Sequence, residues 1–208
     1  PVELGETTRT MLAGVAQAGG PEAKLIKQLL AGGKAGKRAA ATLSKSPHFN
    51  ALLRTTFVAT MLEAGTRVNV LPSRANANVN CRVLPGVDLR GFIKQVEAWI
   101  ADPAVKVIYD EADLESPHAS PVMHPFFEAV RKVSGSHFPG AIVMPVMSPG
   151  ATDSRFLRAM GIPAYGLLPF PMIREDDRRM HAADERLPVA AFEPALKFSY
   201  DLLLEACR

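Results

Sequence analysis

An alternating segment followed by a turn and an amphipathic helix constrains the fold of this chain more than any other feature. Successive strand residues point to opposite faces, so Asn76, Asn78, Asn80 and Arg82 would share one face while Ala77, Val79, Cys81 and Val83 share the other. This alternation predicts a half-buried strand with a polar outer face. Pro85-Gly86 then turns the chain, and Asp88 is placed to cap a helix whose apolar positions include Phe92, Val96 and Trp99.

The segments on either side complete a pattern of mixed helices and strands. Residues 1–47 carry apolar residues at helical spacing and predict one or two helices. Residues 55–62 and 66–71 are β-branched and apolar, which predicts two strands, and residues 105–109 predict one more. This order is most of a ferredoxin-like α+β sandwich that lacks its first strand. We read residues 1–113 as this domain.

A polar, proline-bearing crossing at residues 111–121 separates a second, α/β pattern, which we assign to residues 114–208. It predicts a helix at 125–134, strands at 141–146 and 162–168, and a short helix between them. A closing helix begins at Pro188 and is expected to bury one apolar stripe, formed by Val189, Phe192, Leu196, Tyr200 and Leu203.

Composition excludes several classes of protein. The chain is 208 residues long and 48% hydrophobic, which is ample for a packed core, and no apolar run reaches the length of about 18 residues that a membrane span needs. Cys81 and Cys207 form no disulfide framework or metal spacing, and Cys81 is expected to act as a small hydrophobe. The net charge is only +3. Most of the excess positive charge lies near the N-terminus, in Lys24, Lys27, Lys34, Lys37, Arg38 and Lys45. These residues could bind nucleic acid or could form a solvated helical face, and we favour the solvated face.

The polar chemistry is concentrated between residues 148 and 185. Gly150 allows a close backbone approach or a positive φ, and Thr152 and Asp153 offer acceptors at the start of a short helix, which makes the corner suited to an anion. His181 lies between a charged loop and a new helix start, where an imidazole is exposed rather than buried. A surface histidine without a role is the alternative for His181.

These residues resemble the end of the catalytic domain in the zinc-dependent M20 peptidases, in particular the branch of carboxypeptidase S and the N-acyl amino acid hydrolases. The likeness lies in a "GTD-x-R-F" corner and an "H-x-x-D-E" loop, matched here by Gly150, Thr152, Asp153, Arg155, Phe156, His181, Asp184 and Glu185. Ala151 stands where the family often has a second glycine. A further series resembles the family's lid, or dimerisation, domain: Arg54-Thr-Thr, Ala64-Gly65, Asn69 to Pro72, Ala75, Asn78 to Arg82 and Leu84-Pro-Gly86.

The resemblance implies a role for each candidate residue. His181 would bind one of two zinc ions, although another divalent metal would also suit it. Arg82 and Asn69 would reach a substrate's carboxylate and carbonyl oxygen, and Gly150 and Thr152 would complete that pocket. Asp153 and Arg155 are expected to hold the shape of the corner. The substrate would be a peptide or an N-acyl amino acid with a free carboxylate, and no nucleic-acid partner is expected.

The remaining zinc ligands and the general base are absent at any recognisable spacing, since the chain has no H-x-D and no Glu-Glu pair in an apolar context. We therefore expect the sequence to be the C-terminal part of a longer enzyme. The rival interpretation is a non-catalytic dimerisation or scaffold fragment, a homodimer through the lid that binds no metal by itself. The chain opens on Pro1, so any targeting signal would lie upstream and the compartment, cytoplasmic or exported, stays open.

Overall fold

The computed structural model of the chain describes residues 2–114, 119–177 and 179–207, and these form two compact units. The first comprises Pro1–Ala119 and Met144–Ile162, and the second comprises Ser120–Val143 and Pro163–Arg208. The predicted crossing at 111–121 includes residues 115–118, which lie outside the described part. The predicted division of the chain after residue 113 stays a prediction.

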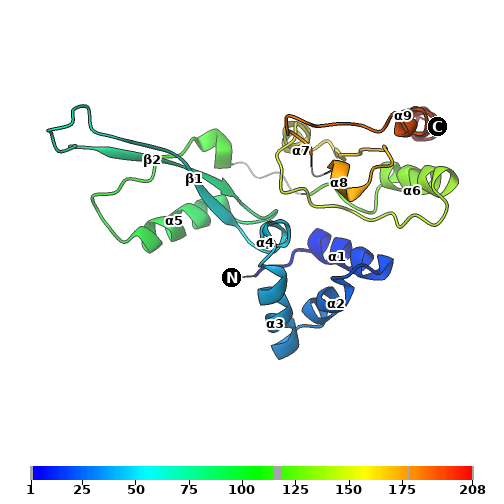
Figure 1. The fold of residues 1–208 in the computed structure, drawn as a ribbon, viewed down its shortest axis with the longest axis horizontal. Helices are drawn as coiled ribbons and strands as arrows, with labels where there is room; N and C mark the ends of the chain where they lie inside the picture. Colours follow the sequence, from blue (N-terminus) through cyan, green and yellow to red (C-terminus); the bar gives the residue numbers. More distant parts are fainter. Residues whose placement is uncertain (1, 115–118, 178, 208) are drawn as a thin grey trace. The chain divides into compact units, whose positions relative to one another are not determined.

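Four helices open the first unit: α1 (Glu6–Ala18), α2 (Ala23–Ala31), α3 (Gly33–Leu43) and α4 (Pro47–Leu53) (Figure 1). They form because apolar residues recur at helical spacing, and the fully buried Leu12, Ile26 and Leu53 join them in one core. The close approach of α2 and α3 favours glycine at position 36, since a Cβ there would lie 3.0 Å from the carbonyl oxygen of Gln28. Helices were predicted for this segment, and the structure contains more of them than the one or two expected.

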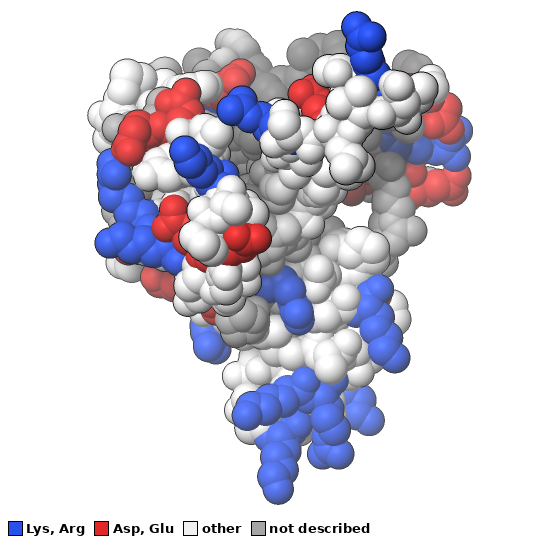
Figure 2. Space-filling model, turned by 90° about the vertical axis from the view of Figure 1, so that its left-hand side faces the viewer, with Lys and Arg blue, Asp and Glu red and all other residues white. Residues whose placement is uncertain are grey.

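Basic side chains gather over α2 and α3, at the lower end of Figure 2. Lys24, Lys27, Lys34, Lys37, Arg38 and Lys45 are all exposed, and within the described ranges none of them takes part in an ion pair. No acidic residue occurs between Glu22 and Glu63 to neutralise them. The structure therefore places the cluster on a solvated helical face.

The sheet is an antiparallel ribbon of β1 (Thr56–Ala64) and β2 (Ala75–Arg82). Thr56 pairs with Arg82 and Ala64 with Ala75, and the register shifts near Thr60, whose hydroxyl donates to Asn78 Oδ1 at 3.1 Å. The predicted strands at 55–62 and 75–84 are thus confirmed. The prediction of a strand at 66–71 is wrong, because this segment reverses the chain between β1 and β2, with the N–H of Val70 donating to the carbonyl of Arg67.

The expectation that β2 is half-buried is also wrong. Every residue of β2 is exposed, and even Val79 on the apolar face keeps 46% of its surface accessible. A two-stranded ribbon has no neighbouring strands to help cover either face. The described residues 105–109 form no strand, so the strand predicted there is absent as well.

Helix α5 (Leu89–Ile100) follows the ribbon as predicted, and the carboxylate of Asp88 accepts a hydrogen bond from the N–H of Arg90 at 3.1 Å. Its aromatic residues pack on β1: the ring of Phe92 stacks on Phe57 with centroids 5.6 Å apart, and Trp99 meets Phe57 edge to face. The short helices η1 (Glu111–Leu114) and α7 (Ser154–Ala159) complete the regular structure described in this unit. A small sheet with segregated helices places the chain in the α+β class.

The second unit is built on the packing of α6 (Pro125–His137) against α9 (Val189–Ala206). The short α8 (Arg174–Asp177) precedes α9 in the sequence. Phe198 of α9 is 1% exposed and packs against Val130 and Val133 of α6. Two polar contacts flank this core: His137 Nε2 lies 2.7 Å from Asp201 Oδ2, and Lys132 Nζ lies 2.6 Å from Glu205 Oε1. None of the described helices is both long and apolar enough to cross a membrane.

Two predictions for this region are wrong. The strands predicted at 141–146 and 162–168 do not form within the described residues, whose sheet contains β1 and β2. The stripe predicted to be buried on α9 is instead exposed, while Ala191, Ala195, Phe198 and Leu202 form the packed face. The reason is that α9 turns toward α6 the face that carries Phe198 and Leu202, which pack with Val130 and Val133, and this leaves the predicted stripe outside.

Candidate functional site

The loop between α8 and α9 carries His181, which has an unusual backbone. Its φ is +67°, a left-handed conformation that residues other than glycine adopt at a cost of about 1–2 kcal/mol. The side chain is exposed, and the backbone N–H donates to Glu185 Oε2 at 3.2 Å. The imidazole therefore lies on a strained turn that is accessible to solvent. Its exposure was predicted from the sequence, whereas the strain was not.

The described histidines differ in whether their rings have partners. His124 Nδ1 accepts a hydrogen bond from the N–H of Phe126 at 3.2 Å and so caps α6, His137 is paired with Asp201, and His48 contacts the ring of Phe49 edge to face. His118 lies outside the described residues. Among the histidines that the structure describes, His181 alone has a ring with no hydrogen-bond or ring contact, so both its nitrogens are free for a ligand.

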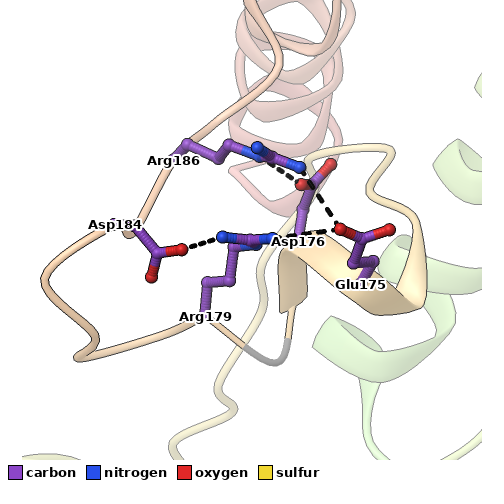
Figure 3. Close-up of polar contacts among 5 residues, drawn as sticks. All are labelled: Glu175, Asp176, Arg179, Asp184 and Arg186. Atoms are coloured by element: carbon purple, nitrogen blue, oxygen red, sulfur yellow. Dashed lines mark hydrogen bonds and ion pairs between the residues drawn. The ribbon is translucent and has the colours of Figure 1, made fainter.

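A network of charged side chains surrounds this loop (Figure 3). Arg179 donates to Glu175 Oε1 at 3.0 Å and, on its other side, to Asp184. Arg186 donates through Nε to Asp176 Oδ1 at 2.6 Å, and this hydrogen bond raises the pKa of the Arg186 guanidinium. These roles were not predicted from the sequence, although the acidic run Glu175-Asp-Asp177 between arginines and the i,i+4 spacing of Glu175 and Arg179 were a usable signal.

The backbone strain at His181 predicts an unusual order of stabilities. We expect His181→Gly to unfold with a free energy about 0.5–1 kcal/mol higher than that of His181→Ala, because only glycine adopts a positive φ without a Cβ clash. Urea denaturation of the two variants measures the difference. Ala98→Gly in α5 is the matched control and should be destabilising, since the helical backbone there is ordinary. A His181→Ala variant as stable as His181→Gly would show that the turn is unstrained.

The corner at Gly150 differs in detail from its prediction. Gly150 does not use a positive φ; its N–H donates to Ser148 Oγ at 3.1 Å. The carbonyl of Thr152 accepts from the N–H of Arg155 at 3.1 Å, and Asp153 is the N-cap of α7 without a side-chain capping bond. The side-chain acceptors of this exposed corner are thus not engaged at the helix start.

Asn69 and Arg82 occupy different parts of the β1–β2 ribbon. Arg82 ends β2 opposite Thr56, whereas Asn69 lies in the turn beyond the pair Ala64 and Ala75, the loop at the far left of Figure 1. The strand between them is roughly 23 Å long. The structure therefore does not bring these two predicted substrate-binding residues together. Both belong to the first unit, as do Gly150 and Thr152, while His181 belongs to the second.

The donors of the described part do not amount to a complete metal site. A zinc ion in a hydrolase takes about three protein ligands. No group of three or more His, Cys, Asp or Glu side chains with suitable geometry occurs within residues 2–114, 119–177 and 179–207. The free imidazole of His181 fits zinc as a single ligand, so further ligands would have to come from elsewhere.

Comparison with known proteins identifies relatives of this chain. The family model for the peptidase dimerisation domain of M20 enzymes matches residues 14–108. A probable carboxypeptidase S-like protein 2 of Dictyostelium discoideum is 30% identical over 77% of this chain and 31% of its own length. The human N-fatty-acyl-amino acid synthase/hydrolase PM20D1 is 31% identical over 79% of this chain and 33% of its own length.

Human aminoacylase-1 is 31% identical over 74% of this chain and 41% of its own length. The chain thus spans between about a third and two fifths of the relatives it matches, and no solved structure is significantly similar to it. All three relatives are hydrolytic enzymes of one family, and the matched residues carry the lid motifs between Arg54 and Gly86. This chain therefore belongs to the M20 family of peptidases and amidohydrolases, and it contains the family's dimerisation domain.

Proposed function

We propose that this chain supplies the lid and the C-terminal part of the catalytic domain of a dizinc M20 hydrolase, which cleaves a peptide or N-acyl amide bond next to a free carboxylate. The observation that carries the proposal is the unpartnered, exposed imidazole of His181 in an H-x-x-D-E loop of an M20 chain. The names of the relatives, a carboxypeptidase S-like protein, an N-fatty-acyl-amino acid hydrolase and an aminoacylase, support this substrate class.

Unsatisfied apolar surface supports a larger catalytic domain around the second unit. The stripe on α9 is exposed, with Val189 at 90% and Leu203 at 63%. Soluble proteins seldom leave such surface uncovered. We propose that further strands and helices of the same enzyme cover it, and that residues 1–113 form a ferredoxin-like lid whose first strand comes from another part of that enzyme.

In this proposal each residue has a separate task. His181 would bind as neutral imidazole, and the zinc ions when bound would activate water and polarise the scissile carbonyl. Arg82 is exposed at the end of a strand, where its guanidinium can donate two parallel hydrogen bonds to the substrate carboxylate. Gly150 and Thr152 would add a backbone N–H and a hydroxyl from their corner. Asn69 is proposed for the carbonyl oxygen, although one small substrate could not reach both Asn69 and Arg82 of a single chain.

The role of Arg82 gives a direct test in the full-length protein. We expect Arg82→Ala to lower kcat/KM for an N-acyl amino acid by about 10–100-fold, since hydrogen bonds to a charged group contribute roughly 1.5–3 kcal/mol each. The same variant should barely change kcat/KM for the matching N-acyl amino acid amide, which has no carboxylate. Arg74→Ala, an exposed arginine at the other end of β2, is the control.

Two results would count against the proposal. If Arg82→Ala lowers activity equally on the acid and the amide, Arg82 does not recognise the carboxylate. If a zinc chelator leaves hydrolysis by the full-length protein unchanged, the metallohydrolase itself is excluded. That second result would favour the rival function, a dimerisation or scaffold module, which is supported by the matched dimerisation domain and by the lack of a three-ligand group in the described residues.

A homodimer is the proposed assembly under either function. The dimerisation domain supports it, and so does the exposed apolar surface of the ribbon and α5, to which Val58, Leu62 and Trp99 contribute.

A further inference from the structure

We propose that Arg179 is a positioning residue for His181: its guanidinium ties the two ends of the His181 loop together and so holds the imidazole in the conformation that binds metal. The inference rests on the proposed function of His181 as a metal ligand. It concerns a residue outside the H-x-x-D-E pattern, and it follows from the contacts in Figure 3.

The loop needs such a tie because little else holds it. Its backbone hydrogen bonds are local turns, among them Ala182 N–H to the carbonyl of Arg179 at 2.8 Å and Glu185 N–H to that of Ala182 at 3.1 Å. Met180 and Leu187, the apolar residues on either side of His181, are both exposed. No hydrophobic anchor therefore fixes the turn, and the strained φ of His181 would relax if the loop were free.

Arg179 is the residue whose contacts enclose His181. One side of its guanidinium donates to Glu175 on α8, before the loop, and the other donates to Asp184, beyond the histidine. A planar fork with several donors can serve two carboxylates at once, which a lysine ammonium on a flexible stem does less well. The guanidinium is also largely covered, with 27% of the side chain exposed and Nε buried without a hydrogen-bond partner.

A second arginine braces the same acidic pair on α8. Arg186 donates to the buried carboxylate of Asp176 and lies 3.7 Å from Glu175, so Glu175 faces both guanidinium groups. The residues on both sides of His181 are therefore fastened to α8 through one connected network. Each ion pair between exposed side chains contributes only about 0–1 kcal/mol to stability, so we expect these contacts to act mainly on the geometry of the loop.

The test is Zn²⁺ affinity of the full-length protein, measured by competition with a chromophoric chelator, because this readout does not depend on turnover. Arg179→Met removes both ion pairs while keeping most of the side-chain length, and we expect it to weaken the His181-dependent zinc site about 10–100-fold, the range found when partners of metal ligands are removed. Arg179→Lys should recover part of the loss. Lys132→Met, which removes the 2.6 Å pair with Glu205 in the same unit, should leave zinc affinity unchanged.

The outcomes separate this inference from the proposed function. If His181→Ala weakens zinc binding and Arg179→Met does not, the positioning role is wrong while the ligand role survives. If neither variant weakens it, the ligand role of His181 is wrong. If Arg179→Met also lowers the unfolding midpoint, Asp184→Asn is the deciding variant, because it removes only the contact of Arg179 with Asp184. The inference requires that Asp184→Asn weakens zinc binding while the unfolding midpoint stays unchanged. Unchanged zinc binding in this variant overturns the inference.

Discussion

Replacing Phe198 with alanine is expected to lower the free energy of unfolding by about 3–5 kcal/mol, the usual cost of truncating a buried phenylalanine. Phe198 is 1% exposed, and the rings of Phe138 and His137 both lie 5.6 Å from its own, centroid to centroid. It is the largest fully buried side chain between α6 and α9, so its removal leaves a cavity in the core of the second unit. Because whole domains are stable by only about 5–15 kcal/mol, the loss should be plain in urea denaturation followed by circular dichroism.

Tyr200 on the same helix provides the matched control. It is also aromatic, but 64% of it is exposed, and Tyr200→Ala should change the unfolding free energy of this chain by less than about 1 kcal/mol. Equal losses for the two variants, or a larger loss for Tyr200, would mean that α9 packs through the apolar stripe that the sequence predicted and not through the face that the structure buries.

Replacing His181 with alanine should have the largest effect on function. In the full-length protein we expect His181→Ala to weaken zinc binding and to lower kcat about 100-fold or more, since losing even an outer partner of a metal ligand costs about 10–100-fold. Metal content measured by mass spectrometry and turnover of an N-acyl amino acid should fall together. The exposed ring nitrogens of His181 give the physical reason, because no protein group competes for them among the described residues.

His48→Ala is the control for this prediction, since His48 is also exposed and its ring meets that of Phe49 edge to face. It should leave both metal content and turnover unchanged. If His181→Ala lowers turnover while the zinc content stays complete, His181 acts in another way than as a ligand. If both quantities stay at the wild-type value, it is a surface histidine without a role.

Much of the local structure was predictable because it depends on neighbouring residues. The turn Pro85-Gly86, the cap at Asp88 and the apolar spacing of Phe92 and Val96 correctly located α5. The alternation of residues 75–84 correctly located β2, but its burial was wrong, because alternation reports a difference between two faces and not whether a partner covers either of them. The absent strands at 105–109, 141–146 and 162–168 have the same cause, since a strand exists only where a second strand pairs with it.

The candidate site divides in the same way. Its residues could be named from short motifs, and the dimerisation domain that those motifs imply is confirmed by the family match. The burial, hydrogen bonds and backbone angles around those residues could not be named, because they depend on side chains that meet only after the loop has folded back on α8. One example is the pair of contacts that Arg179 makes with Glu175 and Asp184. Another is the backbone of Gly150, which does not adopt a positive φ.

By itself, the sequence determined the positions of α5, α6 and α9, the two strands of the ribbon, the family and the presence of an exposed histidine, since spacing, caps and motifs act over a few residues. Only the tertiary structure decided which face of α9 is buried, where Arg82 and Asn69 lie on the ribbon, and which of the described histidines keeps a free ring. The physical reason is that burial and partnership are properties of pairs of elements, and a single element's pattern carries no information about what packs against it.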